Sequence, residues 1–181
     1  MGRDKALIPI GGRPMVARVA DALWVAGARD VVAIGREPDA LASLGLATVP
    51  DGRPGAGPAG GIATALSRAA AHVDDDEIVF VVGCDLVAPS PAAIGATLAV
   101  LADHPGAAVA VPVSAGRTQW HHAAWRASAA PALEAVLDTG VRAVGAVVAA
   151  AGLVVAGVDG IDPAVLADAD EPGDIPQAGA R

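Results

Sequence analysis

The chain has 181 residues, of which 54% are hydrophobic and 18% are charged, and its formal net charge is −8. This composition is typical of one well-packed globular domain, and it excludes a nucleic-acid-binding surface, which needs clustered Lys and Arg. Because no apolar stretch is long enough to cross a bilayer, the first residues do not resemble a signal peptide and Cys84 is the single cysteine, we expect a protein of the reducing cytoplasm.

Helical and extended patterns alternate through the first part of the chain. Apolar residues recur at helical spacing from Met15 and stop before Gly27, a residue type that often ends helices. Short uninterrupted apolar runs indicate buried strands. In chain order we expect a loop with a turn at Gly11-Gly12 over residues 1–14, a helix over 15–26, a strand over 31–35, a short helix over 38–44 and a short strand over 46–49.

A loop rich in glycine and proline follows over residues 51–61, and it leads directly into an expected helix over 62–71. Glycines such as Gly57 and Gly60 let backbone N–H groups approach an anion closely at the start of a helix. A plain linker of low complexity is the alternative interpretation. The pattern favours anion binding because the loop ends at the helix itself.

An unbroken apolar run over residues 78–82 is followed by a single carboxylate, Asp85. The run has no polar alternation, so we expect both faces of this strand to be covered, as at the centre of a parallel sheet. Ligands of open α/β sheets bind beyond the carboxyl ends of the strands, which places Asp85 where a ligand or metal would lie. The alternative is that Asp85 only caps a turn.

The second part of the chain continues the alternation, and Ser90 and Ser128 are suited to cap helices. The order of elements indicates a doubly wound α/β fold with a mostly parallel central sheet and one antiparallel strand in the later half. We expect one domain over residues 1–175 and a disordered tail over 176–181. The expected elements are a helix over 91–102, strands over 107–113 and 118–125, helices over 129–137 and 142–151, a strand over 153–158 and a polar turn over 168–175.

Several short segments lie in the order and spacing of a known family. They are residues 1–7 with Lys5, Gly12-Arg13-Pro14, Asp51 ahead of residues 57–62, Cys84-Asp85 and, more loosely, residues 168–175. Together they make the chain resemble the molybdenum cofactor guanylyltransferase family, within the Rossmann-like nucleotidyltransferases. The resemblance implies a Rossmann-like three-layer fold and the transfer of GMP from GTP to molybdenum-molybdopterin cofactor, with release of pyrophosphate.

The same resemblance implies roles for individual residues. Lys5 and Asp85 would be catalytic, with Lys5 at the nucleotide phosphates and Asp85 as the ligand of Mg²⁺, a cation that prefers oxygen donors. Asp51 would contact the guanosine side of GTP, and Gly57 and Gly60 would complete the GTP site. From residue type alone, Lys5 fits a surface position and Asp51 fits an ordinary turn. The resemblance also implies a monomer that contacts cofactor-delivery proteins.

Three further polar residue types have weaker interpretations. Adjacent strand residues face opposite sides, so His121 and His122 are poorly placed to share one metal, and we expect one of them to line the second-substrate side. Cys84 ends a buried strand without a candidate base, which favours a packing role. Arg142 fits either a pterin phosphate contact or a solvent-exposed position.

The chain also departs from the family pattern. The strongest family motif, a strand followed by Leu-Ala-Gly-Gly, belongs ahead of Met1 and is absent from the sequence, so we expect a start assigned too late and a fold that lacks a central strand. The aspartates of residues 168–172 resemble the cytidylyltransferase relatives, whereas residues 57–60 resemble the guanylyl type. The alternatives are therefore a CTP-dependent enzyme, a sugar-phosphate or phospholactate nucleotidyltransferase, and a non-catalytic nucleotide-binding homologue.

Overall fold

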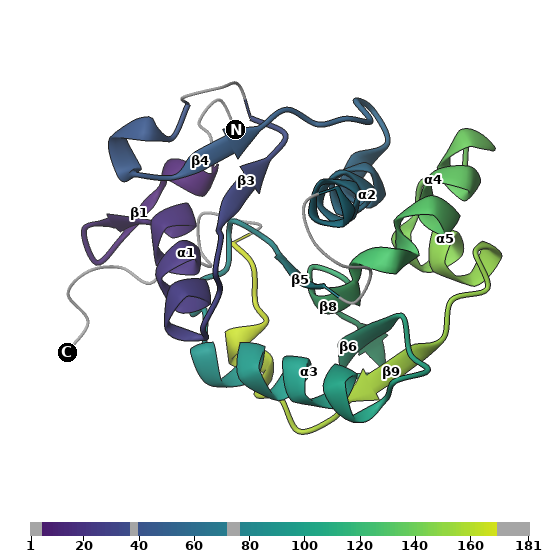
Figure 1. Cartoon of the computed structure of the whole chain (residues 1–181). Helices are drawn as coiled ribbons and strands as arrows, with labels where there is room; N and C mark the ends of the chain where they lie inside the picture. Colours follow the sequence, from purple (N-terminus) through teal and green to yellow (C-terminus); the bar gives the residue numbers. More distant parts are fainter. Residues whose placement is uncertain (1–4, 37–39, 72–76, 170–181) are drawn as a thin grey trace.

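Helices lie on both sides of a mixed β-sheet in the computed structural model, which describes residues 5–36, 40–71 and 77–169 (Figure 1). This arrangement confirms the predicted α/β class. The tail expected over 176–181, the end of the expected domain at residue 175 and most of the polar turn over 168–175 lie outside the described residues.

The N-terminal part is a short hairpin that leads into a helix. η1 (Lys5–Leu7), β1 (Pro9–Ile10) and β2 (Arg13–Pro14) precede α1 (Met15–Val25). Gly11 and Gly12 have φ angles of 59° and 82°, which side-chain-bearing residues rarely adopt, so they form the predicted turn between β1 and β2. The helix predicted over 15–26 is confirmed by α1, which buries an apolar stripe.

Two short strands form a separate parallel pair. β3 (Val32–Ile34) pairs with β4 (Ala47–Val49), which confirms both predicted strands. The helix predicted over 38–44 is reduced to η2 (Ala42–Leu44), whereas residues 37–39 lie outside the described part of the chain. Gly45 ends η2 in the left-handed conformation, with φ at 70°.

The helix α2 (Gly57–Ala70) begins earlier than the sequence predicts, at residue 57 rather than 62. Pro58 lies in its first turn, where the fixed φ of proline favours the helix and its missing N–H costs nothing. Residues interpreted as the end of a loop therefore belong to the helix, and the glycine-rich stretch supplies the first turn of α2.

The larger sheet is mixed in strand direction. β5 (Ile78–Val82) pairs with β8 (His122–Arg126), β8 pairs with β6 (Val109–Ser114), and β6 also pairs with β7 (Arg117–Thr118) and β9 (Val155–Val158). β8 runs antiparallel to β5 and β6, whereas β6 and β9 are parallel. The antiparallel strand expected in the later half is β8. Because β8 lies between β5 and β6, the expectation of a mostly parallel sheet is confirmed only in part.

A turn interrupts the strand that the sequence predicts over 118–125. The N–H of Gln119 donates to the carbonyl of Pro112, and the N–H of His122 donates to the carbonyl of Gln119, both at 2.9 Å. One continuous strand cannot make both contacts, so the segment divides into β7 and β8.

Three helices complete the layers: α3 (Pro91–Asp103), α4 (Ala130–Asp138) and α5 (Val144–Ala150), with the short η3 (Ala127–Ala129) and η4 (Pro163–Val165). The hydroxyl of Ser90 caps α3 as predicted, because it accepts a hydrogen bond from the N–H of Ala93 at 3.3 Å. The predicted cap at Ser128 is wrong. Ser128 lies inside η3, which runs directly into α4, and α4 has no side-chain cap.

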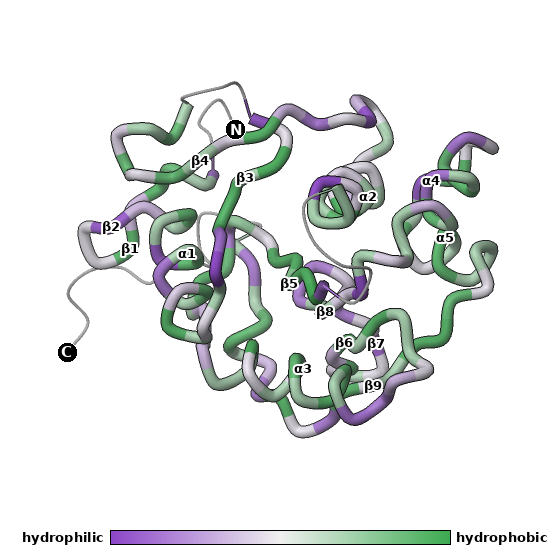
Figure 2. Tube along the Cα trace, in the orientation of Figure 1, coloured by the Kyte–Doolittle hydropathy of each residue, from purple (hydrophilic) through white to green (hydrophobic). Residues whose placement is uncertain are grey.

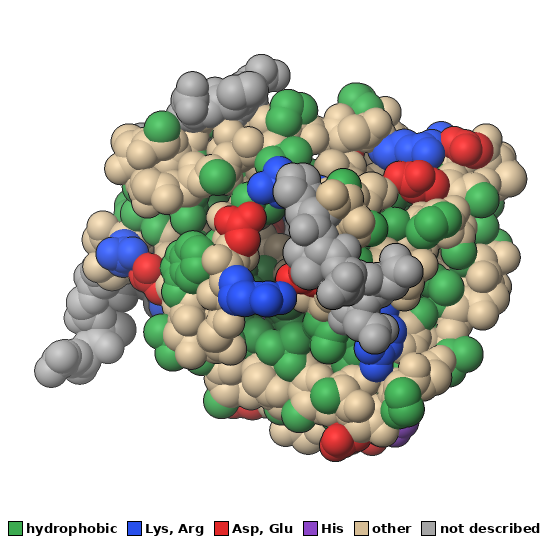
Figure 3. Space-filling model, viewed as in Figure 1, with side chains coloured by type: hydrophobic (Ala, Val, Ile, Leu, Met, Phe, Trp, Pro, Cys, Tyr) green, Lys and Arg blue, Asp and Glu red, His purple; other side chains and the backbone are tan. Residues whose placement is uncertain are grey.

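Apolar side chains fill both sides of the larger sheet. Trp125 and Val109 belong to the main cluster, together with side chains of α2, α4 and α5, whereas Leu101 of α3 packs with Ala110 and Val158 on the other face. Figure 2 shows β3 and β5 as hydrophobic segments. Lys and Arg side chains are scattered over the face shown in Figure 3, and several lie beside acidic side chains.

Candidate functional site

The loops that follow β3, β4 and β5 converge. Gly35 follows β3, and its N–H donates to the carbonyl of Val49 at the end of β4, at 2.8 Å. Arg36 then reaches the loop after β5, where its Nη2 lies 3.9 Å from the sulfur of Cys84. The carboxyl ends of all three strands therefore meet, as expected for the ligand-binding edge of an α/β sheet.

Asp85 lies in this convergent region together with a second carboxylate. Its backbone carbonyl accepts a hydrogen bond from the N–H of Ala169 at 3.0 Å, and Leu86 pairs with Asp168 in an antiparallel bridge. Asp85 and Asp168 line the same cavity, of about 1110 Å³, which lies between β3 and β5 and is named here the β3–β5 cavity. The structure therefore places the predicted Asp85 beside an Asp168 whose role the sequence did not predict.

The backbone around Asp85 is closely packed. A Cβ atom added to Gly83 would lie 3.0 Å from Oδ1 of Asp85, so a side chain at residue 83 would press on this carboxylate. The N–H of Gly83 donates to the carbonyl of His121 at 2.9 Å, which fixes the end of β5 to the segment before β8. Gly83 thus leaves room for the Asp85 side chain in its present position.

Asp51 holds the turn that follows β4. Its Oδ1 accepts hydrogen bonds from the N–H of Arg53 at 2.8 Å and from the hydroxyl of Thr64 at 3.2 Å. The first contact closes a turn and the second holds that turn against α2. Asp51 is not among the residues that line the β3–β5 cavity, and its contact with guanosine stays a prediction.

The first turn of α2 borders the cavity through Pro58 and Gly61. No side chain caps this helix, so its first N–H groups are not satisfied by a capping oxygen. Gly57 has φ at 63° and open space around it. Gly60 is buried, and an added Cβ atom would lie 2.8 Å from the Cβ of Ala56, so packing requires glycine there whatever the ligand.

The loop before α2 is tied to α4 by an ion pair between Arg53 and Asp138. The hydrogen bond from the Arg53 guanidinium to the Asp138 carboxylate raises the pKa of Arg53 above its usual value. A Cβ atom on Gly60 would also lie 2.9 Å from the carbonyl oxygen of Arg53. These contacts hold the start of α2 in a defined position beside the cavity.

The segment that contains Lys5 lies beside the segment that contains Asp85. Ala6 is fully buried in a small cluster with Val16 and Leu41, and Cys84 packs against the same cluster. Cys84 therefore has the predicted packing role. Lys5 itself is half-buried and is not one of the residues that line the cavity, so its phosphate contact stays a prediction.

The two adjacent histidines face different surroundings, as predicted. His121 lines the β3–β5 cavity with Asp85. His122 is buried, its ring meets that of Phe80 edge to face with centroids 4.9 Å apart, and burial lowers its pKa to about 4. His122 is therefore a neutral core residue near pH 7. Within the described residues, no group of three or more His, Cys, Asp or Glu is placed to hold a metal ion.

Two basic residues, Arg142 and Arg36, differ in their position relative to the cavity. Arg142 donates to the carbonyl of Leu137 at 2.7 Å and so satisfies the C-terminal end of α4 rather than facing the cavity. Arg36 lines the cavity and contacts Cys84, and it is not among the residues predicted for the site. Its signal was present, because a basic residue directly after a short buried strand lies at the ligand-binding edge of the sheet.

Among the described residues, no helix has the length and apolar character that a membrane span requires.

Residues 1–152 match the family described as MobA-like NTP transferase domain. Over 137 residues the chain is 34% identical to a molybdenum cofactor guanylyltransferase of Rhizobium meliloti (strain 1021). The aligned residues cover 75% of this chain and 62% of the relative. Over 99 residues it is 37% identical to the molybdenum cofactor guanylyltransferase of Xanthomonas euvesicatoria pv. vesicatoria (strain 85-10). Here the aligned residues cover 55% of this chain and 47% of the relative.

Solved structures show the same fold at low sequence identity. Molybdopterin-guanine dinucleotide biosynthesis protein A of Archaeoglobus fulgidus superposes with a TM-score of 0.66 at 19% identity, over 86% of this chain and 75% of that one. The 2-C-methyl-D-erythritol 4-phosphate cytidylyltransferase of Thermus thermophilus superposes with a TM-score of 0.68 at 21% identity, over 94% of this chain and 90% of that one. The chain spans about half to three fifths of the two relatives described above. Because the family match covers residues 1–152, which is most of the chain, the chain belongs to the MobA-like NTP transferase domain family.

Proposed function

We propose that this nucleotidyltransferase joins the GMP of GTP to molybdenum-molybdopterin cofactor and releases pyrophosphate. The name shared by the relatives in Rhizobium and Xanthomonas supports this substrate pair. The observation that supports it most is that the carboxyl ends of β3 and β5 border one cavity, with Asp85, Asp168 and Arg36 among its lining residues. Carboxylates and a cation at such an edge suit the binding of a nucleotide and its metal.

The reaction determines which charges this region must supply. A phosphate oxygen of the cofactor attacks the α-phosphorus of GTP, and the bond from that phosphorus to the bridging oxygen of pyrophosphate breaks. Negative charge grows on the bridging and leaving oxygens, so positive charge stabilises the transition state. In this proposal Lys5 contacts the phosphates, and Arg36 supplies a second cation from the end of β3.

The carboxylates fit a magnesium ion. Mg²⁺ is commonly held by one or two carboxylates together with substrate phosphates and water, so Asp85 and Asp168 are a sufficient donor set without a larger protein cluster. In this proposal Asp85 holds the ion and Asp168 lies beside it. When bound, Mg²⁺ supplies positive charge to the phosphate oxygens.

The nucleoside would lie toward the loop before α2. Asp51 is assigned to the guanosine side through its second carboxylate oxygen, because Oδ1 holds the turn at Arg53 and Thr64. Gly57 lies in open space at the uncapped start of α2, where backbone N–H groups can meet a phosphate. Gly60 acts indirectly, by letting the loop and the helix pack together.

A CTP-dependent reaction is the second candidate function. The placement of Asp168 beside Asp85 favours it, because the sequence around Asp168 resembles the cytidylyltransferase relatives. The Thermus structure of similar fold is also a cytidylyltransferase, one that acts on methylerythritol phosphate. A sugar-phosphate or phospholactate acceptor belongs to the same candidate class.

Nucleotide-dependent thermal melting distinguishes these functions. A ligand that binds the folded chain raises its melting temperature, so we expect GTP with Mg²⁺ to raise it more than CTP with Mg²⁺ at the same concentration. A larger shift with CTP would replace the first proposal by the second. The absence of a shift with either nucleotide would contradict both and support a homologue that no longer binds nucleotide.

A further inference from the structure

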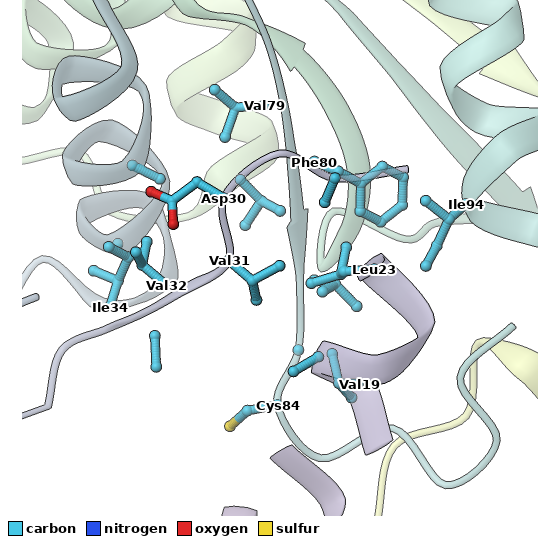
Figure 4. A pocket seen from close by; sticks show the side chains of 18 of the residues that line it. Val19, Leu23, Asp30, Val31, Val32, Ile34, Val79, Phe80, Cys84 and Ile94 are labelled. Carbon is cyan, nitrogen blue, oxygen red and sulfur yellow. The ribbon is translucent and has the colours of Figure 1, made fainter. Parts of the chain in front are cut away.

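The larger sheet has an outer strand at each end, and the two ends have different surroundings. β5 borders the β3–β5 cavity, where side chains of α1, α3 and the β3 segment lie around it (Figure 4). At the other end β9 pairs with β6 alone within the described residues, and it lies at the outside of the molecule (Figure 1). The second edge of β9 is therefore a free sheet edge, whose backbone groups are open to pairing.

The free edge of β9 lacks the residues that usually protect such an edge. Edge strands commonly carry charged side chains or proline, which disfavour pairing with a second chain. Residues 143–158 include neither a charged residue nor a proline. The exposed side chains here are apolar: Val154 and Val155 are 59% and 41% exposed, and Val113 on β6 is 40% exposed. This edge therefore favours a partner strand over water.

Val113 and Val155 lie on one face of the sheet with Gly157 between them. Val155 is opposite Val109 in the parallel register, and Gly157 is opposite Val111. Both of these β6 residues belong to the main cluster, so this is the face that α2, α4 and α5 cover elsewhere in the sheet. A Cβ atom on Gly157 would lie 3.8 Å from Cγ2 of Val113. The exposed apolar face thus has a gap at residue 157, two positions from the Val155 side chain.

The free backbone groups of β9 come from Val155 and Gly157. The carbonyl of Val154 accepts a hydrogen bond from the N–H of Ala108 at 2.9 Å, so this carbonyl points toward the β6 side. Because the C=O and N–H of one trans peptide unit point in opposite directions, the N–H of Val155 points toward the free edge. Alternation along the strand gives the backbone groups of Gly157 the same direction.

We propose that the free edge of β9 pairs with the same edge of a second copy of this chain, about a two-fold axis at Ala156. In this antiparallel register Val155 of one copy exchanges two hydrogen bonds with Gly157 of the other, and the axis repeats the exchange. Each Val155 side chain then lies beside the gap at a glycine. Leu153 does not extend the ladder, because its N–H already donates to the carbonyl of Val148 at 3.2 Å.

The charge distribution permits this pairing, although the chain has a net charge of −8. Asp159 is the first charged residue after β9. In the proposed register it lies beside Leu153 of the second copy, so the two Asp159 side chains are at opposite ends of the ladder, about 20 Å apart at about 3.4 Å per residue. Their repulsion is largely screened, since the Debye length is about 8 Å at physiological ionic strength.

The pairing leaves the candidate site accessible. β8 and β6 lie between β9 and β5, so the second copy lies at the end of the sheet away from the β3–β5 cavity. The family resemblance implies a monomer. The two-fold dimer is therefore a property of this chain's own edge strand, and it is independent of the proposed function.

Sedimentation velocity of the full chain over a concentration series measures the association. We expect a species of twice the chain mass of 17.6 kDa at high concentration and nothing larger, because a two-fold pairing uses the edge of both copies. Val155→Lys should abolish the dimer, because it places two ammonium groups beside the axis. Val25→Lys is the matched control, since Val25 is a 75% exposed valine on α1, and this variant should dimerise like the parent.

Amide hydrogen exchange followed by NMR locates the interface. We expect the N–H groups of Val155 and Gly157 to exchange about tenfold more slowly, or slower still, in the dimer than at concentrations where the chain is monomeric. The N–H of Ala108 is the internal control, because it donates to Val154 inside the sheet and should exchange equally in both states.

Three results would overturn the proposal. A chain that stays monomeric at every concentration would show that the edge does not pair with a second copy, and protection of Val155 and Gly157 in that monomer would assign the edge to a segment of the same chain. A dimer that survives Val155→Lys, or that leaves these two amides unprotected, would use another surface. Species larger than a dimer would mean open-ended association. No readout needs nucleotide, so failure here leaves the proposed function untouched.

Discussion

Similar apolar strands are buried to different extents in two regions of the molecule. The closed side is the region around β6, and the open side is the region of β3 and β5. On the closed side, β6 has strand neighbours on both edges, and its Val109 and Val111 are fully buried. On the open side, β3 and β5 are equally apolar, yet their residues are only half-buried. Apolar composition alone therefore does not bury a strand. Burial follows from the neighbours on both edges and both faces.

The candidate site lies where these two sides meet. Asp85 follows β5, the strand that belongs to the closed sheet on one edge and faces the β3–β5 cavity on the other. Arg36 and Asp51 come from the open side. The geometry of the site therefore depends on how firmly the open side is held against the closed side, and the following variants probe that difference.

The largest expected effect separates two tryptophans. Trp125 is fully buried on the closed side, whereas Trp24 lies on α1 of the open side with 47% of its surface exposed. We expect Trp125→Ala to lower the free energy of unfolding by about 3–5 kcal/mol, because it leaves a cavity in the main core. Trp24→Ala should change it by less than about 0.5 kcal/mol. Urea denaturation measures both, and equal losses would contradict the contrast between the two sides.

The next effect is a pH dependence from His122 in the core. Burial lowers the pKa of His122 from 6.5 to about 4, so the unfolded chain takes up this proton more readily than the folded chain. Its contribution to stability is present above pH 6.5 and is lost as the pH falls toward 4. We expect a loss of up to about 3 kcal/mol in the free energy of unfolding across this range.

The variant His122→Leu isolates that contribution. Leucine fills the apolar site beside Phe80 without a titrating group. Urea denaturation at several pH values should therefore show a smaller loss between pH 6.5 and pH 4 than in the parent chain. The same pH dependence in both chains would mean that His122 is already protonated or solvated in the folded state.

The smallest of these effects is expected at the start of α2, the helix that contacts both sides. Gly60→Ala places a Cβ atom 2.8 Å from the Cβ of Ala56 and should cost about 1–3 kcal/mol through overpacking. Gly61→Ala is the matched control, because its Cβ atom meets nothing within 4 Å and alanine favours a helix by about 0.5–1 kcal/mol. Equal destabilisation by both variants would show that the close approach at Gly60 is not the cause.

The sequence predicts elements well where one local pattern decides them. The run at residues 78–82 matches β5, and the cap at Ser90 matches the start of α3. The prediction fails where two local signals compete. Gly57 and Pro58 indicate a loop by composition and a helix start by the fixed φ of proline, and the helix prevails. At residues 118–125 the turn depends on a contact with Pro112, which no local pattern contains.

The candidate site was predictable only in outline. The strand-end rule indicates Asp85 and would also have indicated Arg36, because both follow apolar runs. Asp168 is different, since its position beside Asp85 depends on a bridge between segments far apart in the sequence. The half-burial of β5 was also not predictable, because an apolar run shows that both faces are covered but not which strands flank it.

The most direct test of the central claim is the pyrophosphate that the chain releases from GTP in the presence of Mg²⁺ and molybdenum-molybdopterin cofactor. Asp85→Asn preserves size and removes the charge that would hold the ion, so we expect a fall of about 10²–10³-fold in rate with an unchanged melting temperature. The control Asp103→Asn, at the exposed end of α3, should keep the parent rate. A near-parental, Mg²⁺-dependent rate in Asp85→Asn would contradict the account.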